Sequence, residues 1–220
     1  YAGARPESRD AQMTSYIDIT LPVTDKLVCW SDRTPPEHRW ERRIDLGEHC
    51  NTSFWGMSAH AGTHMDAPLH FVDGGTAIDQ VRPEVFIGEC VVVDLQLEGT
   101  RVMGDALASR HQGEKRLLLK TQQSYSDRHG AYVPHECLLT SAAATILLDG
   151  GLALIGTDRL SVDDSEGKDY SFHHLLLGAG CVILEGLALT GVEPGRYSLL
   201  AAPLRLSETE ASPVRALLAK

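Results

Sequence analysis

The chain has 220 residues, a formal net charge of −10 at pH 7 and a hydrophobic share of 43%, which is enough to build the core of one ordinary domain. The acidic balance argues against nucleic acid as a partner. No apolar run approaches the roughly 20 residues that a helix needs to cross a bilayer, so no membrane partner is expected.

The first residues are polar, and the five cysteines are widely spaced. Residues 1–13 are rich in small and charged groups, so we expect a flexible tail, with residues 14–220 forming a single domain. This start lacks the apolar segment of a signal peptide. The cysteines form no CxxC pair, which indicates reduced thiols in a cytoplasmic protein. They are Cys29, Cys50, Cys90, Cys137 and Cys181.

The first third of the chain favours short strands and loops. Residues 16–20 alternate in polarity like a short strand, and residues 39–46 have the pattern of an exposed one. Trp30 lies between them in a segment of loop-forming residues, where it can fill the core or form a wall of a substrate pocket. Residues 53–59 lean apolar and run directly into a histidine-rich segment, so this segment is expected at the end of a strand.

From residue 89 onward, predicted strands alternate with predicted helices. This alternation indicates an α/β domain with a mixed or mostly parallel sheet. The strands are expected at 89–95, 116–120, 152–156 and 181–185, and the helices at 102–110, 140–149 and 172–177. A helical turn is expected at 77–81. A last strand at 197–206, interrupted at Pro203, and a helix at the chain end complete the prediction.

The densest group of chemically active side chains lies between residues 60 and 70. The segment reads His60-Ala-Gly-Thr-His64-Met-Asp66-Ala-Pro-Leu-His70. Imidazoles and carboxylates this close need partners, and a divalent metal ion can serve them all. The glycine and proline argue against a continuous helix, whereas two residues of spacing would put His64 and Asp66 on one side of an extended segment. We expect three of the four to bind metal and one to remain for chemistry.

Candidates for the rest of the site lie far along the chain. His173 and His174 stand at the start of a predicted helix, where one of the two can face solvent. Glu185 ends a buried strand and therefore needs a partner, either a metal ion or a basic side chain. Asp163, Asp164 and Asp169 are expected to be solvated loop charges, with contact to substrate or to a ligand histidine as the alternative.

The pattern His60-x-Gly-Thr-His64-x-Asp66-x-Pro-x-His70 resembles the signature of the metal-dependent cyclase-like hydrolases. This family includes bacterial kynurenine formamidase, isatin hydrolase and proteins of aromatic polyketide pathways. Further similarity lies at 161–163, 183–187 and 211–216, and the resemblance extends over about residues 15–217.

The resemblance implies roles for individual residues. His70 would be the uncoordinated acid and base, and Trp30 would contact substrate. The implied cofactor is Zn²⁺ or Mn²⁺, as one or two ions. The implied fold is a compact α/β barrel-like sandwich, assembled as a dimer or larger homo-oligomer. The implied metal ligands are His60, His64, Asp66, His173 and Glu185.

The function expected from these residues is hydrolysis of an amide, lactam or lactone bond in a small-molecule substrate, as in an arylformamidase. The chain departs from the formamidase pattern at 30–34, at 121–137 and at Arg159-Leu160, all of which are candidate pocket edges. These departures motivate the alternative of a metal-dependent cyclase or dehydratase in aromatic polyketide or other natural-product biosynthesis. A non-catalytic metal-binding protein is the third possibility.

Overall fold

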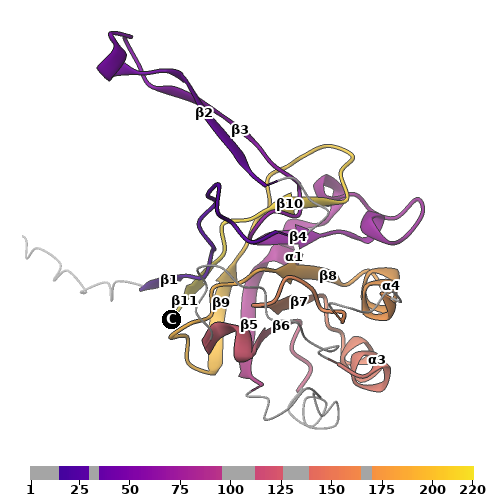
Figure 1. Ribbon diagram of the computed structural model, residues 1–220. Helices are drawn as coiled ribbons and strands as arrows, with labels where there is room; N and C mark the ends of the chain where they lie inside the picture. The colour runs from indigo at the N-terminus through magenta and orange to yellow at the C-terminus, as the bar shows by residue number, and fades with distance from the viewer. Residues whose placement is uncertain (1–14, 30–34, 96–111, 126–138, 165–169) are drawn as a thin grey trace, which may run out of the picture.

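A curled mixed sheet forms the body of the protein (Figure 1). The computed structural model describes residues 15–29, 35–95, 112–125, 139–164 and 170–220. The strands are β1 (Tyr16–Asp18), β2 (Glu37–Arg42), β3 (Thr52–Gly56), β4 (His64–Asp66), β5 (Ile87–Asp94), β6 (Arg116–Lys120), β7 (Leu154–Thr157), β8 (Val182–Glu185), β9 (Gly195–Leu200), β10 (Ala211–Pro213) and β11 (Leu217–Ala219). Nine of them form one sheet, in the order β1-β11-β9-β5-β6-β7-β8-β4-β10.

The described helices are short. They are η1 (Ile44–Leu46), η2 (Pro68–His70), η3 (Ile78–Gln80), η4 (Gln122–Tyr125), α1 (Pro83–Phe86), α3 (Ser141–Asp149) and α4 (Ser171–Gly178). Thr140 caps the N-terminus of α3, because its hydroxyl accepts a hydrogen bond from the Ala143 N–H at 3.1 Å. None of the described helices is long and apolar enough to cross a membrane.

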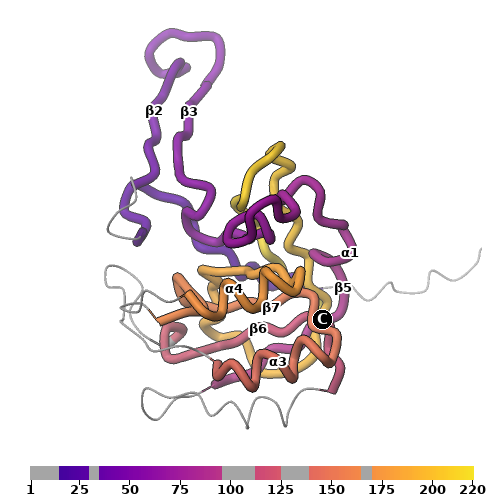
Figure 2. The backbone as a smooth tube through the Cα atoms, turned by 90° about the vertical axis from the view of Figure 1, so that its right-hand side faces the viewer, coloured from indigo at the N-terminus to yellow at the C-terminus, as the bar shows by residue number. Residues whose placement is uncertain are grey.

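The alternation predicted from residue 89 onward is confirmed in the centre of the sheet. Strands β5, β6, β7 and β8 are parallel neighbours, and the strands on either side of them run antiparallel. Helices α3 and α4 lie against one face of this parallel part (Figure 2). Leu117 and Leu119 pack in the cluster beneath the helices, whereas Leu118 packs in the cluster on the opposite face. The sheet is therefore buried on both faces, as its continuous apolar strands indicate.

The prediction of a helix at the chain end is wrong. Residues 211–213 and 217–219 form β10 and β11 instead. Pro213 cannot donate the hydrogen bond that a helix interior requires, and Leu218 pairs with both Ile17 of β1 and Leu199 of β9. Partners far away in the chain thus decide the conformation of this segment. The helix expected at 102–110 lies outside the described residues.

Strands β2 and β3 form a hairpin that extends away from the body (Figures 1 and 2). All six residues of β2 are exposed, as the sequence predicts, but the strand ends at Arg42, and residues 44–46 of the expected strand form η1. The end of β3 leads through residues 57–59 to His60. We call residues 37–56 the arm. The base of the arm therefore adjoins the histidine-rich segment.

Candidate metal centre

The pairing of β4 with β8 positions the centre of the site. His64 and Glu185 are direct partners across this antiparallel pair, and Asp66 pairs with Ile183. Because side chains alternate along a strand, His64 and Asp66 point to one face and Met65 to the other, where it lies in the core. Ile183 belongs to the apolar cluster beneath the helices, so Glu185 points to that helical face too. The register thus gathers one imidazole and two carboxylates.

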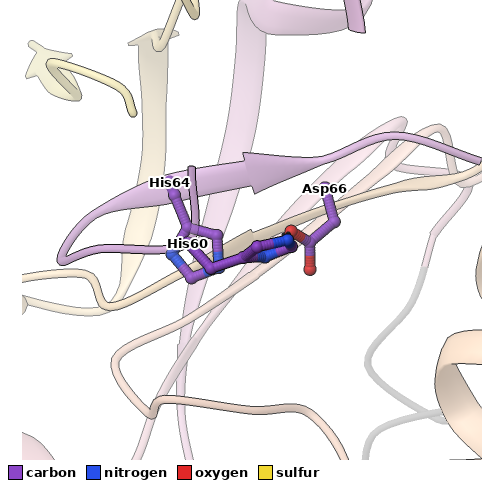
Figure 3. Close-up of side chains that lie close together, drawn as sticks. All are labelled: His60, His64 and Asp66. Atoms are coloured by element: carbon purple, nitrogen blue, oxygen red, sulfur yellow. Dashed lines mark ion pairs between the residues drawn. The ribbon is translucent and has the colours of Figure 1, made fainter. Parts of the chain in front are cut away.

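A tight turn before β4 brings in His60. Gly62 has φ +67°, in the left-handed region, and its carbonyl turns back to accept a hydrogen bond from His64 Nδ1 at 2.9 Å. The rings of His60 and His64 and the carboxylate of Asp66 converge (Figure 3). His60 Nδ1 lies 2.9 Å from Asp66 Oδ1. As expected, the segment forms no continuous helix, but it does not simply end the preceding strand, because His64–Asp66 form the new strand β4 and Pro68–His70 form η2.

Helix α4 supplies a third imidazole from the same face of the sheet. His173 is buried, whereas its neighbour His174 is exposed. The Nδ1–H of His173 donates a hydrogen bond to Asp163, whose carboxylate also accepts the backbone N–H groups of Phe172 and His173. The expectation that Asp163 is a solvated loop charge is wrong, because it is 1% exposed. The alternative, contact with a histidine that is a predicted ligand, is the one observed, because Asp163 accepts from His173.

Asp66 lies in the middle of this group. Its oxygens are 3.5 Å from His64 Nε2 and 3.7 Å from His173 Nε2, and Glu185 is 3.5 Å and 3.6 Å from the same two nitrogens. Two ligands that each lie about 2.1 Å from one ion are separated by roughly 3.0–3.5 Å at octahedral or tetrahedral angles. The distances are therefore close to those between neighbouring ligands of a metal ion.

The chemistry of Asp66 also fits a bound cation. Both of its carboxylate oxygens are buried, and among the described residues neither accepts a hydrogen bond of normal geometry. A buried ionised carboxylate in this condition is costly without a positive partner. His60, His64 and Asp66 place one ligand atom each within 4.8 Å of one another, as a metal ion requires. The donor set of imidazoles and carboxylates suits a divalent ion such as zinc or manganese.

The close packing of these groups shifts the pKa values of the metal-free protein. Burial and the neighbouring charge of Asp66 raise the pKa of Glu185 well above its usual range. Burial alone would raise the pKa of Asp66 as well, but His64 and the other histidines hold it well below its usual range. Burial alone would lower the pKa of His173, but the hydrogen bond to Asp163 and the charge of Asp66 raise it to about 10.

His70 borders the same centre from η2. Its ring centroid lies 4.3 Å from that of His60 and 5.8 Å from that of His173, and Phe71 packs edge-on against it at 4.5 Å. Burial lowers the pKa of His70 to about 4, so this imidazole is neutral near pH 7. His70 also forms a second group of potential ligand atoms with Asp66 and His173.

The structure brings the predicted metal ligands and His70 into one site. Trp30, the predicted substrate contact, lies outside the described residues. Glu210 was missed by sequence reasoning, although its carboxylate Oε1 is 3.1 Å from His60 Nε2. A glutamate in a polar loop carries no local signal of such a contact. For the choice between His173 and His174, the apolar positions Leu176 and Leu177 were a usable signal, since they share a helical face with His173.

Buried imidazoles and carboxylates around one centre, on one face of a mixed α/β sheet, define a metal-dependent hydrolase site. Residues 17–164 match the model of the cyclase family, which is described as "Putative cyclase". Kynurenine formamidase from Salinibacter ruber is 36% identical over 207 residues, covering 92% of this chain and 96% of that protein. The Bordetella avium kynurenine formamidase is 34% identical and covers 91% and 96%. The chain belongs to the cyclase family.

Solved structures agree with this assignment. A protein from Bacillus stearothermophilus described as a predicted metal-dependent hydrolase has a TM-score of 0.80 and 30% identity, covering 94% of this chain and 98% of that one. Isatin hydrolase A from Labrenzia aggregata has a TM-score of 0.73 at 22% identity, covering 94% and 93%. This second likeness shows the shared fold.

Proposed function

We propose that the protein hydrolyses the amide bond of an aryl formamide, with a divalent metal ion held by His60, His64, Asp66, His173 and Glu185. The observation that carries this proposal is the buried carboxylate of Asp66, which faces three imidazoles and accepts no hydrogen bond of normal geometry among the described residues. Support for the substrate class comes from the formamidase relatives, which match more than nine-tenths of both chains.

The described residues divide the chemistry between them. A divalent ion bound at such a site lowers the pKa of water and polarises a carbonyl group. A ring nitrogen of His70, neutral near pH 7, accepts the proton that water loses on attacking the formyl carbon. The same nitrogen then delivers this proton to the leaving amine nitrogen as the C–N bond breaks. The products are formate and an aryl amine.

Phe71 supports the placement of an aryl group beside His70. Its ring lies 4.5 Å from that of His70 and 4.6 Å from that of His173, so an aromatic surface adjoins the centre. Aromatic faces of this kind pack well against a planar ring. A lactam or lactone ring could be opened with the same groups, so these compounds belong in the test.

The test is hydrolysis by the protein loaded with Zn²⁺ or Mn²⁺, measured on N-formylkynurenine, on isatin and on a simple aromatic lactone. We expect formate release from N-formylkynurenine, with loss of activity on chelation and recovery on readdition of metal. A metal-loaded protein that turns over none of the three compounds would overturn the hydrolase proposal and favour the cyclase or dehydratase. Elemental analysis of the purified protein would show which metal is bound and how many ions.

We further infer that the protein is a homo-oligomer, a dimer or tetramer, that associates through its arm. Of the twelve exposed large hydrophobic residues in the described chain, five lie in the arm, and Leu46 is 75% exposed. An isolated two-stranded hairpin has marginal stability in water, so a surface that covers it would stabilise it. The arm carries interspersed acidic and basic residues, which suits contact with a second copy.

The matched test of association is light scattering after size-exclusion chromatography. The wild type and the double variant Trp40→Ser, Leu46→Ser would be compared at the same concentration. We expect an oligomer for the wild type and a smaller species for the variant. A monomeric wild type would overturn this inference without affecting the hydrolase proposal.

A further inference from the structure

Each of the three histidines at the centre has one nitrogen turned inward and the other held by an oxygen atom. His64 donates its Nδ1–H to the carbonyl of Gly62 at 2.9 Å, which leaves Nε2 facing Asp66 and Glu185. His173 donates its Nδ1–H to Asp163, which leaves Nε2 facing the same two carboxylates. These outer bonds fix the tautomer of each ring, because the outer nitrogen carries the proton.

Glu210 completes this pattern for His60. Its Oε1 lies 3.1 Å from His60 Nε2, while His60 Nδ1 lies 2.9 Å from Asp66 Oδ1. The side chain of His60 is 5% exposed and that of Glu210 is 40% exposed. If Nε2–H donates to Glu210, the lone pair on Nδ1 faces the lone pairs of Asp66. That arrangement is favourable when one cation binds both His60 Nδ1 and the Asp66 carboxylate.

The main chain fixes the position of Glu210. The backbone N–H of Ala67 donates to the Glu210 carbonyl at 2.8 Å, and the next residue, Ala211, pairs with Asp66. The strand that follows Glu210 therefore runs directly beside the strand that carries the ligands. Replacing the Glu210 side chain leaves these backbone bonds in place, so its contribution can be tested separately from the fold.

We propose that Glu210 is a positioning residue of the metal centre, which holds His60 with Nδ1 turned inward toward the ion. The inference rests on the proposed metal site, but not on the identity of the substrate. Carboxylate partners of metal-bound histidines orient the ring and raise its basicity, and their loss costs about 10- to 100-fold in metal affinity. Glu210 is the most exposed of the three outer partners, so we expect the lower part of this range.

The experiment measures the affinity of the metal-free protein for Zn²⁺ and, separately, for Mn²⁺ by competition with a chromophoric chelator. Glu210→Ala removes the acceptor, whereas Glu210→Gln keeps an oxygen that can accept the same hydrogen bond. Glu208→Gln is the matched control, because it removes one exposed charge from the same loop. We expect about a 10-fold loss for Glu210→Ala, a smaller loss for Glu210→Gln and no change for the control.

Other results would overturn the proposal in distinguishable ways. Wild-type affinity in Glu210→Ala, or equal losses in all three variants, would show that Glu210 does not position His60. A wild type that binds neither ion would overturn both this inference and the proposed function. A wild type that binds metal but hydrolyses none of the test compounds would overturn the proposed function alone. If Glu210→Ala fails to fold, Glu210→Met, which is of similar size but lacks the acceptor, replaces it.

Discussion

His64 and Glu185 face each other across the pair of strands β4 and β8, and His64 Nε2 lies 3.5 Å from Glu185 Oε2. These residues are far apart in the sequence, yet the strand register makes them neighbours on one face of the sheet. The same pairing joins the histidine-rich segment to the parallel part of the sheet, so the fold and the site depend on one contact between strands.

Glu185→Gln should weaken metal binding by at least about 10-fold, because the amide has no charge to offer the ion and is a poorer ligand than a carboxylate. The measurement is chelator competition on the purified protein. Glu193→Gln is the control, since Glu193 is exposed and belongs to neither group of potential metal ligands found among the described residues. Unchanged affinity in Glu185→Gln would contradict its role as a ligand.

His70→Ala should lower kcat for N-formylkynurenine by about 10²- to 10⁴-fold while the protein retains its full complement of metal. Activity and elemental analysis would be measured on the same preparation. His174→Ala is the matched control, because His174 is an exposed imidazole near the same centre. Loss of one ion in His70→Ala would instead identify His70 as a ligand, together with Asp66 and His173.

Metal binding should release protons, and the affinity should rise with pH. In the metal-free protein the pKa of His173 is raised to about 10, so this imidazole is protonated near neutrality, and the pKa of Glu185 is raised well above its usual range. A metal ion binds only the deprotonated forms and must displace these protons. Titration calorimetry in two buffers of different protonation enthalpy counts them. A metal affinity that decreases as the pH rises from about 6 to about 8 would contradict this expectation.

Gly186→Ala should destabilise the protein by more than about 1 kcal/mol and also weaken metal binding. Gly186 has φ +67°, and an added Cβ would lie 2.4 Å from the carbonyl oxygen of Gly62, which holds His64. Chemical denaturation of the wild type and of Gly186→Ala measures the loss of stability. Gly178→Ala is the control, because an added Cβ there meets no atom within 4 Å. Equal stability of the two variants would show that the backbone at Gly186 yields without strain.

Cys90 and Cys181 should resist alkylation in the folded protein, because burial raises the pKa of each thiol to about 12 and little thiolate exists at pH 8. Cys29 and Cys50 are partly exposed and should react before them. Mass spectrometry of peptides after brief treatment with iodoacetamide gives the extent of reaction at each position. Rapid labelling of Cys181 before unfolding would contradict the packing described for it.

The central part of the fold was predictable because its signals are local. The strands β5 to β8 are short apolar runs separated by turn residues, and α3 has a capping threonine at one end and paired glycines at the other. Strands β10 and β11 carry no comparable signal. They are three residues long, and hydrogen bonds to distant segments decide their conformation. Propensity could not reveal those partners.

The site, like the fold, has residues that local sequence signals indicate and residues that only distant contacts reveal. The spacing of His60, His64, Asp66 and His70 is enough by itself to indicate a metal cluster, because all four lie within eleven residues. The roles of Asp163 and Glu210 depend on which side chains the fold brings within about 3 Å of an imidazole. Asp163 follows an apolar strand in a loop rich in charge, where a solvated position was the natural expectation. The contact with α4 buries the Asp163 carboxylate and makes it a hydrogen-bond partner of His173 instead.

The arrangement of ligands along the chain has a consequence for biosynthesis. His60 and Asp66 emerge from the ribosome early, but His173, Glu185 and the Glu210 carboxylate follow more than a hundred residues later. The centre can therefore form only after the chain has been made through Glu210 and β8 has paired with β4. An ion that binds the completed site and not the nascent chain favours the folded state by mass action. Metal supply during expression should accordingly determine how much protein reaches its native form.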